Sequence, residues 1–106
     1  MQTSPWNVLS SQVGVSTSTE GWRLNVVEPT EDGFRIHQVE VWFATPFLSP
    51  PVVQLGLTGF DLDQRDSPRL TLKAENITST GFLATIATWA DTRVYAVEFQ
   101  WLAIGA

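Results

Sequence analysis

The sequence of 106 residues contains no cysteine and only one histidine. Without cysteine there is no disulfide, no thiolate metal site and no thiol nucleophile, so the stability of the fold has to come from packing or from assembly. The single His37 would need a serine on a strained turn to form a Ser-His-Asp triad, and no G-x-S-x-G signature is present. We therefore interpret His37 as a strand residue at an edge or an interface.

Basic residues and long apolar runs are also scarce. Six Lys and Arg residues stand against eleven Asp and Glu, the formal net charge is -5, and no stretch gathers basic residues into a phosphate-binding stripe. The longest apolar runs are too short to span a bilayer. These features predict a soluble domain with no nucleic-acid partner and no membrane insertion. Residues 2–5 give neither a basic start nor an apolar segment, so no secretory signal is expected in the sequence as it stands, and a longer precursor stays open.

With eleven acidic residues, the chain has enough carboxylates to form a catalytic pair for glycoside hydrolysis, so number alone leaves this activity open. Each of them, however, lies in a turn or alternates with apolar neighbours, as solvated acids do. Asp61, Asp63 and Asp66 in "DLDQRDS" are spaced like part of a calcium loop but lack the glycine and the distal glutamate of an EF-hand. We interpret this segment as a solvated turn, with calcium as the alternative, and expect no cofactor.

An alternation of apolar and polar residues with a period of two runs through most of the chain, and no helical repeat of comparable strength competes with it. Residues 8–18 alternate more weakly, which predicts an N-terminal edge strand within residues 1–20. A single sheet would leave one face of the last run unburied, so the sequence predicts an all-β fold, a small antiparallel β-sandwich of six or seven strands in one domain of residues 1–106. The clear runs cover residues 36–43, 52–57, 69–75, 81–89 and 94–103.

The stretch 87–101 holds two tryptophans, a tyrosine and a phenylalanine around a short turn. Alternation places Val97, Phe99 and Trp101 in the core, with Tyr95 at the end of the same face, and it places Trp89 on the other face of the preceding strand. Large rings at strand ends serve as core caps or as ligand platforms, and composition alone favours the cap. Both interpretations stay open at this point.

Three motifs connect this pattern to a known family. They are "FATPF" followed by "PPVV" within residues 43–53, "NITSTGF" at residues 76–82, and "TWADTRVY" at residues 88–95, which leads into an aromatic-rich strand ending in "WLAI". With these motifs the chain resembles the H-type lectin domain of snail agglutinins and of the C-terminal part of discoidins. The resemblance covers residues 34–105 well and residues 1–30 loosely, and several of its points are core positions.

The resemblance implies a six-stranded sandwich that forms a trimer, or a hexamer of two trimers, and binds galactose or N-acetylgalactosamine between protomers. The implied site residues are Asp32, Arg69, Trp89 and Tyr95. A carboxylate accepts and a guanidinium donates several hydrogen bonds to adjacent hydroxyls, and aromatic rings offer flat faces to the C–H side of galactose. This is binding chemistry, so the chain is predicted not to be an enzyme. A shallow site binds with a Kd of roughly micromolar to millimolar and gains avidity on an oligomer.

One departure from the snail agglutinins bears on the sugar. Those proteins have a histidine directly after the tryptophan, which helps to select the acetamido sugar, and this chain has Ala90 there. The preference between galactose and N-acetylgalactosamine therefore stays open. Thr30 and Glu31, beside the predicted carboxylate, are further candidates for the pocket lining.

A second departure bears on assembly. Snail agglutinins lock their oligomer with cysteines, so packing must hold any trimer here, and outward-facing Trp42, Ala96 and Gln100 are the candidate contacts. Two other functions remain open, a trimeric structural or assembly module without sugar binding and an accessory domain of a glycan-active enzyme. A lectin of this kind is expected outside the cell or at its surface, although the lack of a secretory signal leaves a cytoplasmic location open.

Overall fold

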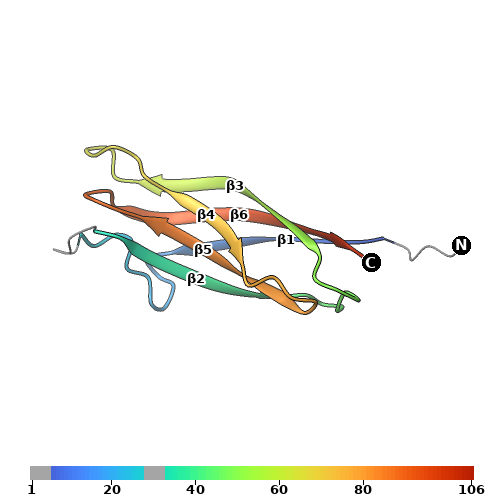
Figure 1. The fold of residues 1–106 in the computed structure, drawn as a ribbon. Coiled ribbons are helices and arrows are strands. Elements are labelled where there is room, and N and C mark those ends of the chain that lie inside the picture. The colour runs from blue at the N-terminus through green and yellow to red at the C-terminus, as the bar shows by residue number, and fades with distance from the viewer. Residues whose placement is uncertain (1–5, 28–32) are drawn as a thin grey trace, which may run out of the picture.

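The computed structural model describes residues 6–27 and 33–106. Neighbouring strands pair antiparallel in two three-stranded sheets, sheet A with the order β1-β6-β3 and sheet B with the order β2-β5-β4 (Figure 1). The predicted antiparallel β-sandwich is confirmed. Within the described ranges, no helix is long and apolar enough to cross a membrane. The six strands are β1 (Asn7–Ser16), β2 (Arg35–Trp42), β3 (Val52–Leu62), β4 (Thr71–Glu75), β5 (Gly81–Thr88) and β6 (Val94–Gly105).

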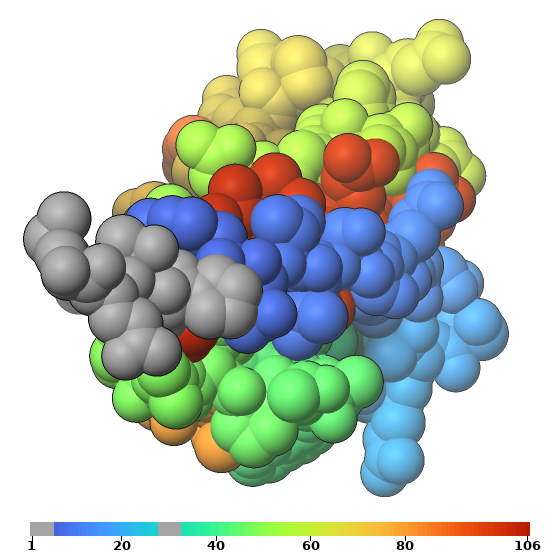
Figure 2. Space-filling model, turned by 90° about the vertical axis from the view of Figure 1, so that its right-hand side faces the viewer, coloured from blue at the N-terminus to red at the C-terminus, as the bar shows by residue number. Residues whose placement is uncertain are grey.

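The molecule is elongated, with principal extents of 58 × 25 × 23 Å, and its two ends differ. One end, termed the rim, gathers the β5–β6 turn, the β3–β4 connection and the approach to β2, and its described segments are 22–27, 33–34, 63–70 and 89–93 (Figure 1). The opposite end, termed the terminal end, carries the C-terminus and the β4–β5 turn. Seen from the terminal end, the blue surface of β1 lies between the red surface of β6 and the green surface of the β2–β3 connection (Figure 2).

The core lies between the inner faces of the central strands β5 and β6, because each has a neighbour on both sides. Val97, Phe99 and Trp101 are buried there, as alternation predicted. At the terminal end, aromatic rings pack with centroids 5.1 to 5.9 Å apart in tilted or edge-on arrangements, which the ring quadrupoles favour. The rings of this aromatic cluster belong to Phe43, Phe47, Phe82 and Trp101.

The alternation of β6 breaks at Tyr95. Asp61 pairs with Ala96 and the next residue, Leu62, pairs with Val94, so Tyr95 is the extra residue of a β-bulge. Val94 is therefore fully buried and Tyr95 is only half-buried. The expectation that Tyr95 continues the core face was wrong, because a bulge shifts the alternation by one residue and leaves no mark in a single strand.

The places of His37 and of the three candidate assembly contacts follow from the sheet order and the sheet faces. His37 lies on the edge strand β2, as predicted, with its ring 5.1 Å from that of Trp22. Trp42 is 69% exposed on the outer face of sheet B. Ala96 and Gln100 alternate with buried residues of β6 and lie on the outer face of sheet A. The three candidate assembly contacts therefore lie on opposite faces of the sandwich.

Candidate functional site

Arg69 stands just before β4 and is fixed against the β5–β6 turn. Its Nη1 donates to Thr92 Oγ1 at 3.0 Å and to the Ser67 carbonyl at 3.4 Å. Thr92 is fully buried, and its hydroxyl donates in turn to the Ser67 carbonyl at 2.6 Å. The Arg69 carbonyl accepts a hydrogen bond from Thr88 Oγ1 at 2.6 Å. Among the described residues these bonds occupy only Nη1 of the guanidinium, so Nε and Nη2 are available to a ligand.

Trp89 directly follows β5 and is half-buried at the rim. Its ring stacks on that of Phe34, with centroids 5.4 Å apart and planes inclined by 17°. Phe34 is 46% exposed, so the pair forms an aromatic surface on the sheet B side of the rim. Sequence reasoning predicted Trp89 and missed Phe34. The sequence signal that would have found Phe34 is alternation. Counted back from Ile36 in the strand, Phe34 falls on the same outer face, and both side chains are exposed.

Ala90 and Gly33 meet at the rim through their backbones. Both adopt left-handed conformations, with φ of 58° at Ala90 and 62° at Gly33. A Cβ atom on Gly33 would lie 3.0 Å from the Ala90 nitrogen and 3.2 Å from its Cα, so only glycine allows this approach. Gly33 directly follows Asp32 in the chain, and its contact with Ala90 joins the approach to β2 to the β5–β6 turn. Asp32, Glu31 and Thr30 themselves lie outside the described residues.

Tyr95 lies on the sheet A side of the rim and donates its hydroxyl to Asp63 Oδ2 at 3.1 Å. The side chain of Asp63 is only 9% exposed and also accepts from Arg65 Nη2 at 2.6 Å. The hydrogen bonds from Arg65 hold the pKa of Asp63 well below its usual range. The bond to this carboxylate raises the pKa of the Tyr95 phenol, so Tyr95 remains a neutral, oriented donor.

The predicted site residues thus fall into three places around one turn. Trp89 belongs to the sheet B side, Tyr95 to the sheet A side, and Arg69 to the network around Thr92 between them. In the described part of the chain, no hydrogen bond or ring contact joins any two of these three side chains directly. A single chain therefore presents the parts of the predicted site on two sides of the rim.

Arg35 is the residue that sequence reasoning missed most completely. Its side chain is fully buried, and its hydrogen bonds reach carbonyls on both sides of the rim. An arginine at the start of a strand is usually read as solvated. The available signal was parity, because alternation counted back from Val41 and Val39 places Arg35 on the core face.

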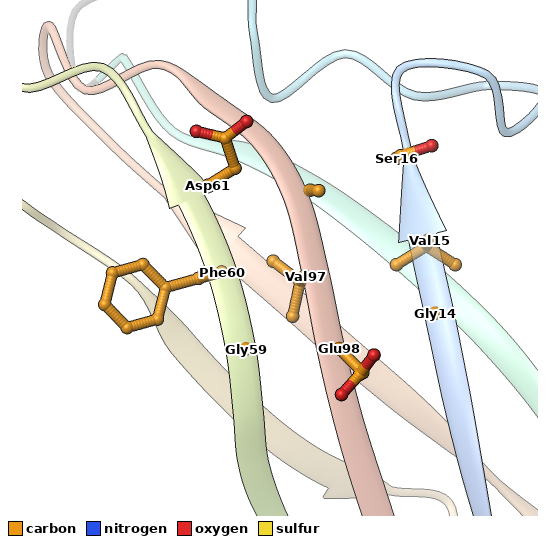
Figure 3. A pocket seen from close by; sticks show the side chains of 9 residues that line it. Gly14, Val15, Ser16, Gly59, Phe60, Asp61, Val97 and Glu98 are labelled. Carbon is orange, nitrogen blue, oxygen red and sulfur yellow. The ribbon is translucent and has the colours of Figure 1, made fainter.

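A shallow groove of about 400 Å³ lies on the outer face of sheet A (Figure 3). Gly14 and Gly59 flank Glu98 across three strands, and Asp61 lies toward the rim. The Glu98 carboxylate accepts from Gln12 Nε2 at 2.7 Å and from Thr58 Oγ1 at 3.0 Å. Among the residues that the structure describes, the predicted sugar-binding residues Arg69, Trp89, Ala90 and Tyr95 do not line this groove.

The acidic segment 61–66 is engaged by basic side chains. Asp63 is paired with Arg65, and Asp66 lies 3.8 Å from Arg93. Across the residues that the structure describes, no group of three or more His, Asp or Glu side chains is arranged to hold a metal ion.

Comparison with known proteins places this geometry in context. The family described as the H-type lectin domain matches residues 38–104. A protein of Fuscovulum blasticum named "ATP synthase subunits region ORF 7" is 42% identical over 77 residues, which are 73% of this chain and 67% of that protein. Discoidin-2 of Dictyostelium discoideum is 37% identical over 65 residues, which are 60% of this chain and 25% of that protein.

Solved structures give the same result for the fold. The native structure of recombinant discoidin II of Dictyostelium discoideum superposes with a TM-score of 0.78 at 31% identity, covering 96% of this chain and 38% of that chain. The wild-type discoidin II structure gives a TM-score of 0.77 at 32% identity, covering 95% of this chain and 37% of that chain. The chain thus spans well under half of the discoidins that it matches, and the likeness concerns one part of them.

Proposed function

Because this chain belongs to the H-type lectin domain family, we propose that it binds glycans ending in galactose or N-acetylgalactosamine at its rim. The observation that carries the proposal is the anchored Arg69, whose guanidinium is held by Thr92 on the turn between Trp89 and Tyr95. An oriented donor between two aromatic side chains suits a pyranose, which has hydroxyls on its edge and C–H groups on its face. A ligand of this class favours an extracellular or cell-surface location.

The proposed contacts divide by chemistry. Arg69 donates to adjacent hydroxyls through the guanidinium nitrogens that Thr92 and Ser67 leave available. Asp32 accepts hydroxyl hydrogen bonds, and the contact of Gly33 with Ala90 supports its place beside the turn. Trp89 offers an indole that Phe34 holds in place by stacking. Thr30 and Glu31 remain candidates for the lining of the pocket.

We also propose that the site is shared between the protomers of a trimer, or of a hexamer of two trimers. The location of Trp89 and Tyr95 on opposite sides of the rim supports this, because a neighbouring chain can supply the missing half of each site. In a cyclic trimer each interface joins two different patches. The placement of Trp42 on sheet B, and of Ala96 with Gln100 on sheet A, fits such an interface.

The outer face of sheet A supports close approach by a neighbour. Gly14, Gly56 and Gly59 lie in strand interiors on this sheet, where glycine costs roughly 0.5 to 1 kcal/mol relative to alanine. A Cβ on Gly14 would meet no atom within 4 Å, and a Cβ on Gly56 or Gly59 would make only ordinary contacts. Gly59 adjoins the β-bulge that follows Leu57. Packing inside the chain does not require Gly14 or Gly56, and bare strand positions of this kind occur where another backbone or a ligand approaches closely.

The test is titration calorimetry with galactose and N-acetylgalactosamine, read beside a glycan array and the molecular mass in solution. Arg69→Ala and Trp89→Ala should each abolish measurable binding. Lys73→Ala on β4 and Trp6→Ala, which removes a ring that is 72% exposed, are the matched controls and should bind normally. Normal binding by both site variants would remove the assigned site. A wild-type chain that binds no sugar at millimolar concentration would favour an assembly module, and turnover of a galactoside would favour an enzyme accessory domain.

A further inference from the structure

We propose that Arg35 is a positioning residue for the sugar site, which sets the spacing between the loop that carries Asp32 and the turn that carries Trp89. The inference rests on the proposed function of the rim. Arg35 begins β2, on the inner face of sheet B, and its side chain is fully buried beneath the rim. Its described hydrogen bonds go to backbone carbonyls, so it acts through the backbone segments that carry the predicted site residues.

The hydrogen bonds of Arg35 join three separate segments of the rim. A guanidinium has five N–H donors in a fixed planar fork, and the five hydrogen bonds described for Arg35 each go to a backbone carbonyl. Two acceptors precede the loop that carries Asp32, one follows it, and two belong to the β5–β6 turn. The acceptors are the carbonyls of Leu24 at 2.9 Å, Val26 at 2.8 Å, Gly33 at 3.1 Å, Ala90 at 3.0 Å and Thr92 at 2.6 Å.

Four of these five carbonyls depend on the guanidinium. They lie in connecting segments, and among the described residues only the Leu24 carbonyl has another backbone donor, the N–H of Val94 at 2.8 Å. A buried carbonyl without a donor is destabilising. Lysine has three donors on a tetrahedral point charge and cannot reach carbonyls in five directions of one plane. The arrangement therefore requires arginine and fixes the distance between the segments that it joins.

The consequence for the site follows from what these segments carry. Gly33 lies between Asp32 and Phe34, and Phe34 stacks on Trp89. Thr92 holds the guanidinium of Arg69. One buried side chain thus joins Gly33, the residue after Asp32, to the turn that carries Trp89 and Thr92. Segments that are already fixed lose little conformational entropy when a sugar binds, and this raises the affinity of a shallow site.

The experiment compares Arg35→Lys with Phe47→Leu in sugar titrations of the whole chain. Phe47→Leu removes packing in the aromatic cluster, at the opposite end of the molecule, and serves as a control for lower stability alone. We expect Arg35→Lys to weaken galactose or N-acetylgalactosamine binding at least about tenfold. Phe47→Leu should leave the Kd within about twofold of the wild-type value, even if it lowers the melting temperature as much as Arg35→Lys does.

A sugar-free measurement separates this inference from the proposed function. Hydrogen exchange should become faster at the amides of residues 89–93 in Arg35→Lys, while the centre of β5 and β6 keeps the protection that it has in the wild type. Unchanged affinity together with unchanged exchange at the turn would overturn the positioning role. Absence of sugar binding by the wild type would overturn the proposed function itself, and the inference with it.

If Arg35→Lys does not fold, a second variant tests the positioning role. Gly33→Ala keeps the guanidinium but places a Cβ 3.0 Å from the Ala90 nitrogen, so it displaces the loop from the turn at the same junction. We expect it also to weaken sugar binding several-fold. Normal affinity in Gly33→Ala would show that the spacing at this junction does not matter, and it would overturn the proposal.

Discussion

The two ends of the sandwich are held together by different interactions. At the terminal end, the aromatic cluster packs by shape, and its contacts depend on volume and burial. At the rim, Arg35, Thr92 and Asp63 bind carbonyls and polar side chains in fixed directions. Apolar packing tolerates substitutions that conserve volume, whereas a directional network fails when one partner is lost. The aromatic cluster and the proposed sugar site therefore lie at opposite ends, and we expect them to respond to different substitutions.

Phenylalanine at the two ends gives the sharpest test of this separation. Phe82 is 4% exposed in the aromatic cluster, and Phe34 is 46% exposed on the rim. Phe82→Ala should lower the free energy of unfolding by about 3 to 5 kcal/mol, measured by denaturant titration, and leave the sugar Kd of the folded fraction unchanged. Phe34→Ala should have a much smaller effect on unfolding and should weaken sugar binding, because Trp89 loses its stacking partner. Equal effects of the two variants on affinity would contradict the separation.

A pair of buried threonines tests the polar network within the rim. Thr92→Val removes both the acceptor for Arg69 and the donor to the Ser67 carbonyl, and we expect it to lower the free energy of unfolding by about 1 to 3 kcal/mol. It should also weaken sugar binding several-fold, because the guanidinium loses its anchor. Thr88→Val, equally buried, removes a bond to the Arg69 carbonyl only. Its stability loss should be similar and its effect on affinity smaller, as calorimetry on both variants would show.

The dependence of stability on pH tests the Asp63 contacts. The pKa of Asp63 is lowered in the folded chain by its hydrogen bonds with Arg65, so the carboxylate stabilises the fold above its unfolded pKa of about 3.9. This contribution is lost as the pH falls from that value toward the lower pKa of the folded state. The stability difference between wild type and Asp63→Asn should be constant from about pH 7 to 5 and shrink below about pH 4. Tyr95→Phe removes one donor and brings the folded pKa of Asp63 closer to the unfolded value, so the loss of stability on acidification should be smaller and should end at a higher pH than in the wild type.

The parts of this structure that depend on a single strand were predictable from the sequence. Alternation within a strand reports which face is buried, and it placed Val97, Phe99 and Trp101 correctly in the core. It also predicted the two-layer sandwich, because several half-buried strands need an opposing sheet. At the rim, residues 89–93 contact the segments 33–34 and 63–70, and the role of this turn in sugar binding stays a prediction.

The remaining features depend on pairing between distant segments. The bulge at Tyr95 arises from the register of β6 against β3, which neither strand encodes alone. The acceptors of Arg35 come from three segments, and a carbonyl has no sequence identity. The bond of Tyr95 to Asp63 joins residues 32 positions apart. Such contacts decide the local geometry of the candidate site, so its arrangement could not be predicted from the sequence.

The smallest expected effect concerns sugar choice at Ala90. This residue has a left-handed φ of 58°, a conformation in which histidine is enriched among residues other than glycine. Ala90→His should therefore fold with little change in stability and place an imidazole beside Trp89. One added hydrogen bond to an acetamido group is worth about 0.5 to 1.5 kcal/mol, so binding of N-acetylgalactosamine relative to galactose should rise about 2- to 10-fold.

The control for this change is Ala90→Gly, which also accepts the left-handed backbone and adds no side chain. It should leave the ratio of the two sugar affinities unchanged, because the backbone of the turn keeps its bond to Arg35. An unchanged ratio in Ala90→His, with binding otherwise intact, would place the acetamido group away from Ala90. A raised ratio would instead show that the turn orients the sugar with its acetamido group toward Ala90.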